Sequence, residues 1–167
     1  DAHLAVLAYT VEDDLYCKAL NDRTVALVVA IEPKAREQKM VTVTAAEMAK
    51  SLSGTGRIAL YGIYFDTNKT DIKPESAQAL EQIAALLKAD PALKVFIVGH
   101  TDNVGSQASN MDLSKRRANA VVAALTSTYG AKAAQMEAAG IGMLSPLASN
   151  DDEAGRAKNR RVELVKK

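Results

Sequence analysis

The first 44 residues contain three short runs with the pattern of β-strands, which predict a strand-rich N-terminal segment. LAVLAY (4–9) and TVALVVAIE (24–32) have the length and the aliphatic or β-branched content of buried strands. KMVTVT (39–44) instead alternates apolar residues with threonine, which is typical of a strand with one exposed face. Three strands are few for an independent hydrophobic core, so we expect this segment to need a partner surface.

A short helix and a glycine-containing break separate this segment from the rest of the chain. Thr44 and Glu47 have the spacing of a capping box, which predicts that a helix begins here. SGTG (53–56) then interrupts the pattern. We therefore predict a strand-rich N-terminal segment over 1–53, which has the pattern of a remnant of an upstream domain, and a second domain over 54–167.

The second domain alternates strand and helix patterns. Its strands are short apolar runs, and its two helices carry apolar residues at helical spacing. This order predicts an α/β sandwich in which both helices pack on one mixed sheet. The predicted elements are the strand RIALYGIYF (57–65), a helix carrying Ala77 to Leu87, the strand ALKVFIVG (92–99), a helix carrying Leu113 to Leu125, and the strands AAQMEAAG (133–140) and NRRVELVKK (159–167), with a loop over 141–158.

Polar segments follow the first two strands of this domain. FDTNKTD (65–71) comes after the first strand and GHTDNVG (99–105) after the second. If the two strands run in the same direction, both segments lie at the same edge of the sheet, where open α/β sheets bind ligands. We therefore expect a binding site at this edge.

Asp102 and Arg117 are the charged candidates for that site. Arg117 lies four residues from both Leu113 and Val121, on the apolar stripe of its helix, and an inward-facing arginine requires an anionic partner. Asn110 lies two helical turns earlier on the same face. From these residues alone, Asp102 also fits a helix cap or a loop-stabilising aspartate, and Asn110 also fits an N-cap.

The overall charge and composition exclude several classes of protein. Lys and Arg total 21 and Asp and Glu total 20, so there is no global attraction to nucleic acid or to an anionic membrane. Apolar residues make up 48%, enough for a sizeable core. The sequence has no apolar run of transmembrane length and no recognisable signal peptide, so any membrane attachment is expected through an upstream anchor outside this chain.

Catalytic and metal chemistry have little support in the sequence. His100 and Asp102 form an H-x-D pair that could begin a metal site, but the only other histidine is His3 and the only cysteine is Cys17. No Ser-His-Asp arrangement or paired-carboxylate arrangement is apparent. The basic residues near the C-terminus could bind phosphate, but RVELV (161–165) alternates polar and apolar residues as an edge strand does. We expect neither an enzyme nor a bound cofactor or metal, and no nucleic-acid partner.

Five sequence blocks occur in a fixed order through the second domain. They are YFDTNKTDIKPES (64–76), VFIVGHTDNVG (95–105), N-x-x-LS-x-x-RA (110–118), G-x-G (140–142) and GR-x-x-NRRVEL (155–164). With these blocks, the region from about residue 56 to 167 resembles the OmpA-like peptidoglycan-binding domain of outer-membrane proteins, Pal-type lipoproteins and flagellar stator proteins. The resemblance implies a non-enzymatic module that anchors a protein to the cell wall, in the periplasm and associated with the outer membrane of a Gram-negative bacterium.

The resemblance also implies a ligand and a set of binding residues. OmpA-like domains bind the diaminopimelate of the peptidoglycan stem peptide, whose side chain ends in a free ammonium and a free carboxylate. Asp102 matches the aspartate that binds the ammonium and Arg117 the arginine that binds the carboxylate, which suits their chemistry. Arg160 or Arg161 is expected to support Asp102. The further positions that match the family's pocket are Asp66, Thr67, Thr101, Asn110 and Leu113.

The segment 1–53 lies outside this resemblance. Unpaired strand edges in it would favour pairing with a second chain, so we expect a homodimer through this segment. An alternative function is a protein–protein adaptor of the cell envelope. In that case the N-terminal segment makes the main interaction and wall binding is secondary.

Overall fold

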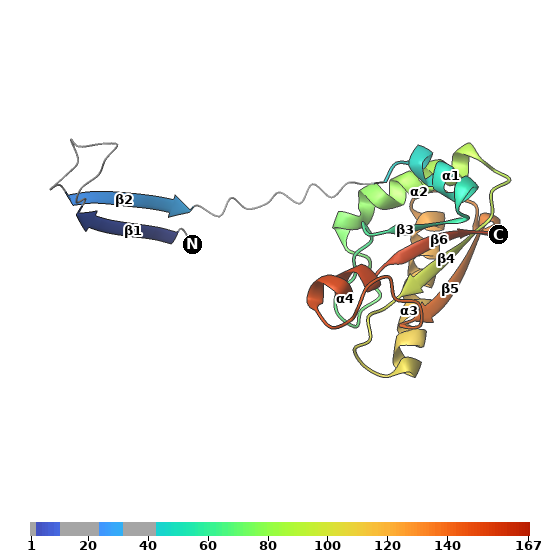
Figure 1. Ribbon diagram of the computed structural model, residues 1–167. Helices are drawn as coiled ribbons and strands as arrows, with labels where there is room; N and C mark the ends of the chain where they lie inside the picture. The colour runs from blue at the N-terminus through green and yellow to red at the C-terminus, as the bar shows by residue number, and fades with distance from the viewer. Residues whose placement is uncertain (1–2, 11–23, 32–42) are drawn as a thin grey trace. The chain divides into compact units, whose positions relative to one another are not determined.

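The computed structural model describes residues 3–10, 24–31 and 43–167, and the chain forms two compact units, 1–39 and 40–167 (Figure 1). In the first unit, β1 (His3–Thr10) and β2 (Thr24–Ile31) form an antiparallel pair. These are the first two strands predicted from the sequence, and both are confirmed. The predicted strand over 39–44 lies mostly outside the described residues.

Helix α1 (Ala45–Gly54) begins with the predicted capping box. The Thr44 side chain accepts a hydrogen bond from the Glu47 backbone N–H, and the Glu47 carboxylate accepts one from the Thr44 backbone N–H at 2.8 Å. Met48 and Leu52 of this helix are buried in the core of the second unit. The compact unit therefore starts before α1, whereas the sequence pattern places the break after residue 53.

The second unit is built on a four-stranded mixed sheet in the order β3-β6-β4-β5. Strand β6 is antiparallel to both of its neighbours, and β4 is parallel to β5. Because β3 and β4 both run opposite to β6, they run in the same direction and their carboxyl ends reach the same edge, although they are not paired with each other. The four strands are β3 (Arg57–Leu60), β4 (Val95–His100), β5 (Met136–Gly142) and β6 (Val162–Lys166).

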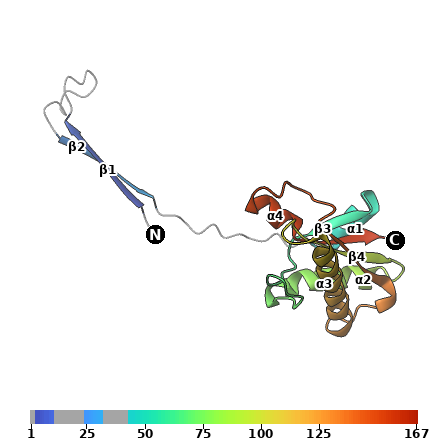
Figure 2. The ribbon, with the colours of Figure 1, turned by 90° about the horizontal axis from the view of Figure 1, so that it is seen from below.

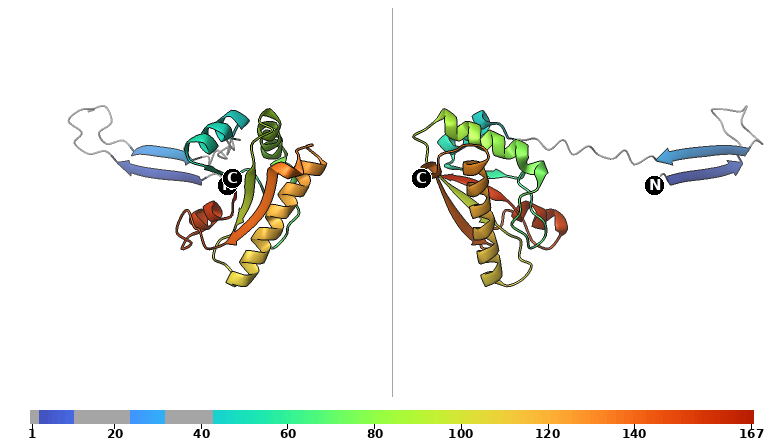
Figure 3. Two further views of the ribbon diagram at one scale, coloured as in Figure 1. Left: turned by 90° about the vertical axis from the view of Figure 1, so that its right-hand side faces the viewer. Right: turned by 180° about the vertical axis from the view of Figure 1, so that it is seen from behind.

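Two longer helices, α2 (Ala77–Ala89) and α3 (Gln107–Ser127), lie on the same side of the sheet (Figures 2 and 3). Alternate residues of each strand point toward them. In β4 these include Ile97, and in β6 Leu164, and both side chains are fully buried in the core. The predicted sandwich of two helices on one mixed sheet is confirmed. Two short 3-10 helices, Pro74–Ser76 and Ala133–Gln135, precede α2 and β5.

Several predicted elements have other bounds in the structure, and two segments differ most. Strand β3 ends at Leu60, because the hydrogen-bonded register with β6 stops at that residue, and the chain then continues to an isolated bridge between Phe65 and Ile72. The segment 141–158 is not only a loop, since it contains the start of α4 (Glu153–Asn159). This helix is seven residues long and lacks an apolar stripe, so hydrophobic periodicity could not reveal it. No helix among the described residues is long and apolar enough to cross a membrane.

Close contact between α3 and the sheet depends on glycine. A Cβ atom on Gly99 would lie 2.2 Å from the Ser114 carbonyl oxygen, and one on Gly140 would lie 2.4 Å from the Lys115 backbone nitrogen. The Ser114 hydroxyl also accepts a hydrogen bond from the Gly142 N–H at 2.9 Å. This packing brings the inward face of α3 beside the carboxyl ends of β4 and β5, where the polar side chains gather.

Candidate functional site

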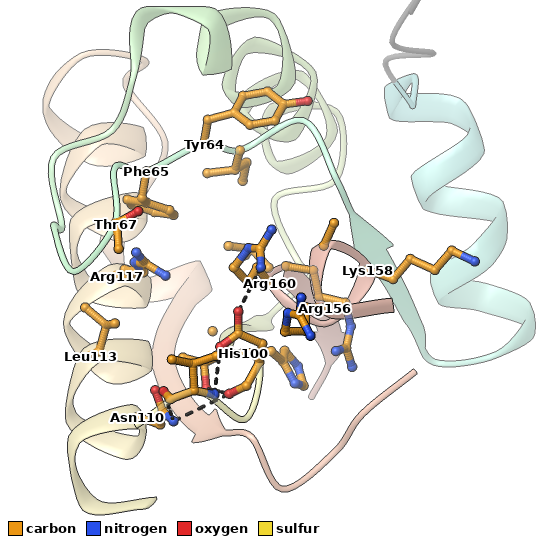
Figure 4. A pocket seen from close by; sticks show the side chains of 18 of the residues that line it. Tyr64, Phe65, Thr67, His100, Asn110, Leu113, Arg117, Arg156, Lys158 and Arg160 are labelled. Atoms are coloured by element: carbon orange, nitrogen blue, oxygen red, sulfur yellow. Dashed lines mark hydrogen bonds and ion pairs between the residues drawn. The ribbon is translucent and has the colours of Figure 1, made fainter. Parts of the chain in front are cut away.

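A cleft of about 800 Å³ lies at the edge of the sheet predicted from the sequence (Figure 4). Its walls come from the segment after β3, the segment after β4, the N-terminal half of α3, and the region from α4 to the start of β6. A cleft of this size is comparable to those that bind drug-sized ligands. Of the eight predicted site residues, seven line it: Thr67, Thr101, Asp102, Asn110, Leu113, Arg117 and Arg160.

Asp102 is largely buried at the end of β4, with 9% of the residue exposed. Its Oδ1 accepts a hydrogen bond from the Val104 N–H at 3.1 Å, and its Oδ2 accepts one from Arg160 Nη1 at 2.8 Å. Thr101 fixes the preceding backbone, because its hydroxyl donates to the Asp102 carbonyl at 2.8 Å and its N–H donates to the Gly142 carbonyl at 3.0 Å. The carboxylate is therefore held in one orientation while facing the cleft.

Arg117 is buried to a similar degree and is held by the loop that follows β3. Its Nε donates to the Lys69 carbonyl at 3.0 Å, and its Nη2 donates to the Asp66 carbonyl at 3.0 Å. The guanidinium carbon lies 4.9 Å from the centre of the Phe65 ring, a cation–π contact. Burial lowers the pKa of Arg117 and the Asp102 carboxylate opposes this shift. The guanidinium stays charged because its ordinary pKa is far above neutral.

Asp66 takes part through its backbone, and its side chain does not line the cleft. The carboxylate is half exposed and forms ion pairs with Lys73 at 3.0 Å and with Lys69 at 3.5 Å. The hydrogen bond from Lys73, together with its charge, lowers the pKa of Asp66. Toward Arg117 the loop supplies backbone acceptors, the carbonyls of Asp66 and Lys69.

Asn110 and Leu113 complete the wall formed by α3 (Figure 4). Asn110 is buried and its amide donates to the Val104 carbonyl at 3.0 Å. It does not cap the helix, because Ser106 is the N-cap and its hydroxyl accepts from the Ser109 N–H. Asn110 thus holds the loop after β4, and Leu113 supplies an apolar surface one turn before the guanidinium.

The two adjacent arginines at the start of β6 have different partners. Arg160 bridges Asp102 and Glu153, the first residue of α4. Arg161 is buried and its Nη2 lies 2.6 Å from Glu163 Oε1. The open choice between the two arginines is therefore settled geometrically, since Arg160 is the one that contacts Asp102. Glu153 was missed by sequence reasoning, because nothing in the apolar pattern indicated the helix that carries it.

His100 is a buried residue in the wall of the cleft. Its ring nitrogens have no hydrogen-bond partner within the described part of the chain, and Nε2 lies 3.8 Å from Glu163 Oε1. Burial, reinforced by the charge of Arg161, lowers the pKa of His100 to about 4, so the ring is neutral near pH 7. Within the ranges that the structure describes, His100 and Asp102 are joined by no third residue that could complete a metal site.

Asp102 and Arg117 thus present one fixed negative and one fixed positive group to the same cleft. They form no ion pair with each other among the described residues, because Asp102 pairs with Arg160 and Arg117 is held by carbonyls. Both charges remain directed to whatever enters the cleft. Such a cleft has the charges that suit a ligand carrying groups of both signs. The OmpA family matches residues 64–160, more than half of the chain, and the chain belongs to this family.

Three relatives illustrate the similarity. Outer membrane protein A of Bordetella avium is 44% identical over 60% of this chain and 52% of that protein. Peptidoglycan-binding protein ArfA of Mycobacterium bovis is 40% identical over 62% of this chain and 31% of that protein. The crystal structure of the peptidoglycan-associated lipoprotein from Burkholderia pseudomallei superposes with a TM-score of 0.58 at 39% identity, over 63% of this chain and 88% of that chain. The chain thus spans about half, or less, of the two full-length relatives.

Proposed function

We propose that the 40–167 unit binds peptidoglycan non-covalently and anchors an envelope protein to the cell wall. Membership of the OmpA family supports this proposal, as do the relatives that are named for binding or associating with peptidoglycan. Within peptidoglycan, we assign the contact to the diaminopimelate of the stem peptide. The cleft would act as a receptor for its free amino-acid end and carry out no chemical conversion.

The orientation of Arg117 is the observation that carries the ligand assignment. Its Nε and one N–H of Nη2 are directed at two backbone carbonyls. A guanidinium has five N–H groups, so the second N–H of Nη2 and both of Nη1 remain. One N–H of Nη1 and the remaining N–H of Nη2 form the end-on edge of the fork, which suits the two oxygens of a carboxylate. Arg117 is therefore set to receive a ligand carboxylate end-on.

Asp102 offers the complementary half of the site. Its two oxygens each use one lone pair, on Val104 and on Arg160, and a carboxylate has about four acceptor positions. A ligand ammonium can therefore bind Asp102 without displacing the contacts that orient it. One carbon carrying both an ammonium and a carboxylate, as at the end of diaminopimelate, matches the two groups together.

The cellular setting of the proposal follows from the relatives. Several are outer-membrane proteins or lipoproteins of Gram-negative bacteria, such as outer-membrane lipoprotein YfiB of Pseudomonas aeruginosa. We accordingly assign this unit to the periplasm, next to the outer membrane, and assign the membrane attachment to a different part of the protein.

The N-terminal hairpin has a separate proposed role in self-association. Strands β1 and β2 pair only with each other among the described residues. Two-stranded sheets are marginally stable alone, and each strand has an unpaired edge. Pairing with a second copy of the chain would supply partners for those edges. Light scattering at rising protein concentration tests this role, and a strict monomer throughout would contradict it.

Calorimetric titration with two stem peptides tests the ligand assignment. One peptide carries meso-diaminopimelate and the other carries lysine at the same position. Lysine keeps the ammonium but lacks the second carboxylate, so Arg117 would be left desolvated with no anionic partner. Sites built around polar groups reject such analogues strongly, because the unpaired group costs more than the lost contact. Equal affinities for the two peptides would contradict the proposal.

A further inference from the structure

Asn68 has a backbone conformation that is unusual for its position beside the cleft. Its φ of 58° is the only positive φ of a non-glycine residue within the described ranges. Asparagine tolerates the left-handed region better than most residues, and β-branched residues tolerate it poorly. Asn68 lies inside a tight turn in which the Lys69 N–H donates to the Asp66 carbonyl at 3.0 Å. The chain reverses at this residue.

The two carbonyls that hold Arg117 belong to the same turn. They are those of Asp66 and Lys69, and each accepts a hydrogen bond of 3.0 Å from the guanidinium. Asn68 lies between them in the chain. Its own φ and ψ therefore decide how one carbonyl points relative to the other, and thus whether both reach the Nε and Nη2 edge of Arg117.

The rest of the loop is fixed independently of Asn68. Phe65 forms a bridge with Ile72, and the Lys73 N–H donates to the Tyr64 carbonyl at 3.0 Å. The Lys73 ammonium also lies 3.0 Å from the Asp66 carboxylate. With both ends held, the loop cannot adjust as a whole, so a change in the turn itself is transmitted to the two carbonyls.

The side chain of Asn68 has no comparable role in holding the fold. It is exposed, and it makes no hydrogen bond to any part of the chain that the structure describes. From this geometry we infer that Asn68 is a positioning residue: its left-handed backbone aims the Asp66 and Lys69 carbonyls at Arg117 and so leaves the end-on edge of the guanidinium for the ligand carboxylate. The inference rests on the proposed function for its ligand.

A pair of variants separates the backbone role from a side-chain role. Asn68→Gly keeps the left-handed conformation at no steric cost and removes the side chain. Asn68→Val removes the amide as well but disfavours that conformation. If the backbone is what matters, the glycine variant behaves like the parent and the valine variant does not.

The first readout needs no ligand. Nuclear magnetic resonance of the arginine Nε–H groups reports whether the Arg117 Nε proton is hydrogen-bonded and slow to exchange. We expect the parent and Asn68→Gly to show a protected Arg117 signal, and Asn68→Val to lose the protection while its backbone amide spectrum stays folded. A protected signal in Asn68→Val overturns the inference whether or not the protein binds peptidoglycan.

The second readout is the affinity for the diaminopimelate stem peptide and for the same peptide with the side-chain carboxylate amidated. We expect Asn68→Val to lower affinity for the first by about tenfold, with little effect on the second, because only the first uses the Arg117 edge. Asn68→Gly should match the parent with both. If the parent protein binds neither peptide, the proposed function is refuted. A binding parent with an unchanged valine variant, or with an equally weakened glycine variant, would refute the role of the Asn68 backbone.

Discussion

Arg160 donates from Nη1 to Asp102 Oδ2 at 2.8 Å and so joins the start of β6 to the end of β4. The other end of its guanidinium is bound to Glu153, which is exposed. Arg160 therefore bridges two carboxylates that line the cleft, one buried and one exposed. Its neighbour Arg161 points to the opposite side of the strand, at Glu163.

Substituting the two arginines should separate binding from stability. Arg160→Gln should weaken binding of the diaminopimelate stem peptide several-fold, because Asp102 loses a contact that orients it. Its effect on stability should be small, since Arg160 is partly exposed and surface ion pairs contribute about 0–1 kcal/mol. Calorimetric titration and urea denaturation of the same preparation measure both quantities.

Arg161→Gln is the matched comparison. It should lower the free energy of unfolding by about 3–5 kcal/mol, because Glu163 would be left as a buried carboxylate without its partner. Equal losses of stability in the two variants would contradict the assignment of Arg160 to the binding site and Arg161 to the interior.

Removing either charge of the site should abolish retention on isolated peptidoglycan. Arg117→Ala and Asp102→Asn each remove one partner of a desolvated charged contact, which costs about 2–5 kcal/mol in binding. Arg117→Lys should fail as well, because an ammonium cannot bind two loop carbonyls and also offer a planar fork. Sedimentation with purified sacculi measures retention.

These variants should remain folded. Asp102→Asn leaves Arg160 paired with Glu153, and Arg117→Ala exposes the Asp66 and Lys69 carbonyls of an exposed loop to water. A circular dichroism melt provides the control. Retention of either variant at the parental level would rule out the assigned site.

Mild acid should destabilise the domain through His100. Its pKa in the folded protein is about 4, below its ordinary value of 6.5, because it is buried beside Arg161 and near Arg57, with Glu163 opposing. The unfolded chain therefore binds more protons between these two pH values, and the free energy of unfolding falls as the pH drops through this range. The difference between the pKa values corresponds to about 3 kcal/mol.

Urea denaturation at a series of pH values between 7 and 4 measures this effect. His100→Gln should flatten the part of the pH dependence that the parent shows above pH 5, where few carboxylates titrate. The slopes of stability against pH are compared, and not the stabilities themselves, because histidine and glutamine both place polar atoms in the same buried position. Identical slopes would show that His100 is protonated in the folded state like an exposed imidazole.

Gly99 should tolerate no side chain. In Gly99→Ala, the new Cβ would lie 2.2 Å from the Ser114 carbonyl oxygen, so α3 must move away from β4. Such overpacking costs about 1–3 kcal/mol, and the shift should also weaken ligand binding because Arg117 lies on α3. Gly54→Ala is the control, since nothing lies within 4 Å of its added Cβ. Thermal melts of both variants test the contrast.

Two kinds of feature could be predicted from the sequence: the helices and strands that have a regular apolar pattern, and the location of the cleft at the sheet edge where parallel strands end. The apolar stripes revealed α2 and α3, and the polar segments after two strands located the cleft near Asp102. The same reasoning did not yield the contacts of Arg117 with Lys69, because a carbonyl acceptor leaves no trace in residue types. It also could not tell which of Arg160 and Arg161 contacts Asp102. Adjacent residues near a strand point in opposite directions, and the residue at which β6 begins depends on where α4 ends, which the sequence did not reveal.

Strand β6 is formed by residues 162–166, yet it lies between β3 and β4 in the sheet. Until those residues are present, β3 has no paired neighbour and the sheet consists of β4 and β5 alone. Synthesis and export both deliver a chain from its N-terminus, so the domain cannot complete its fold while this strand is still to emerge. The cleft also needs Arg160, just before the same strand. Under the proposed function, a chain could bind the cell wall only after it has been delivered through β6, because the cleft is incomplete before that point.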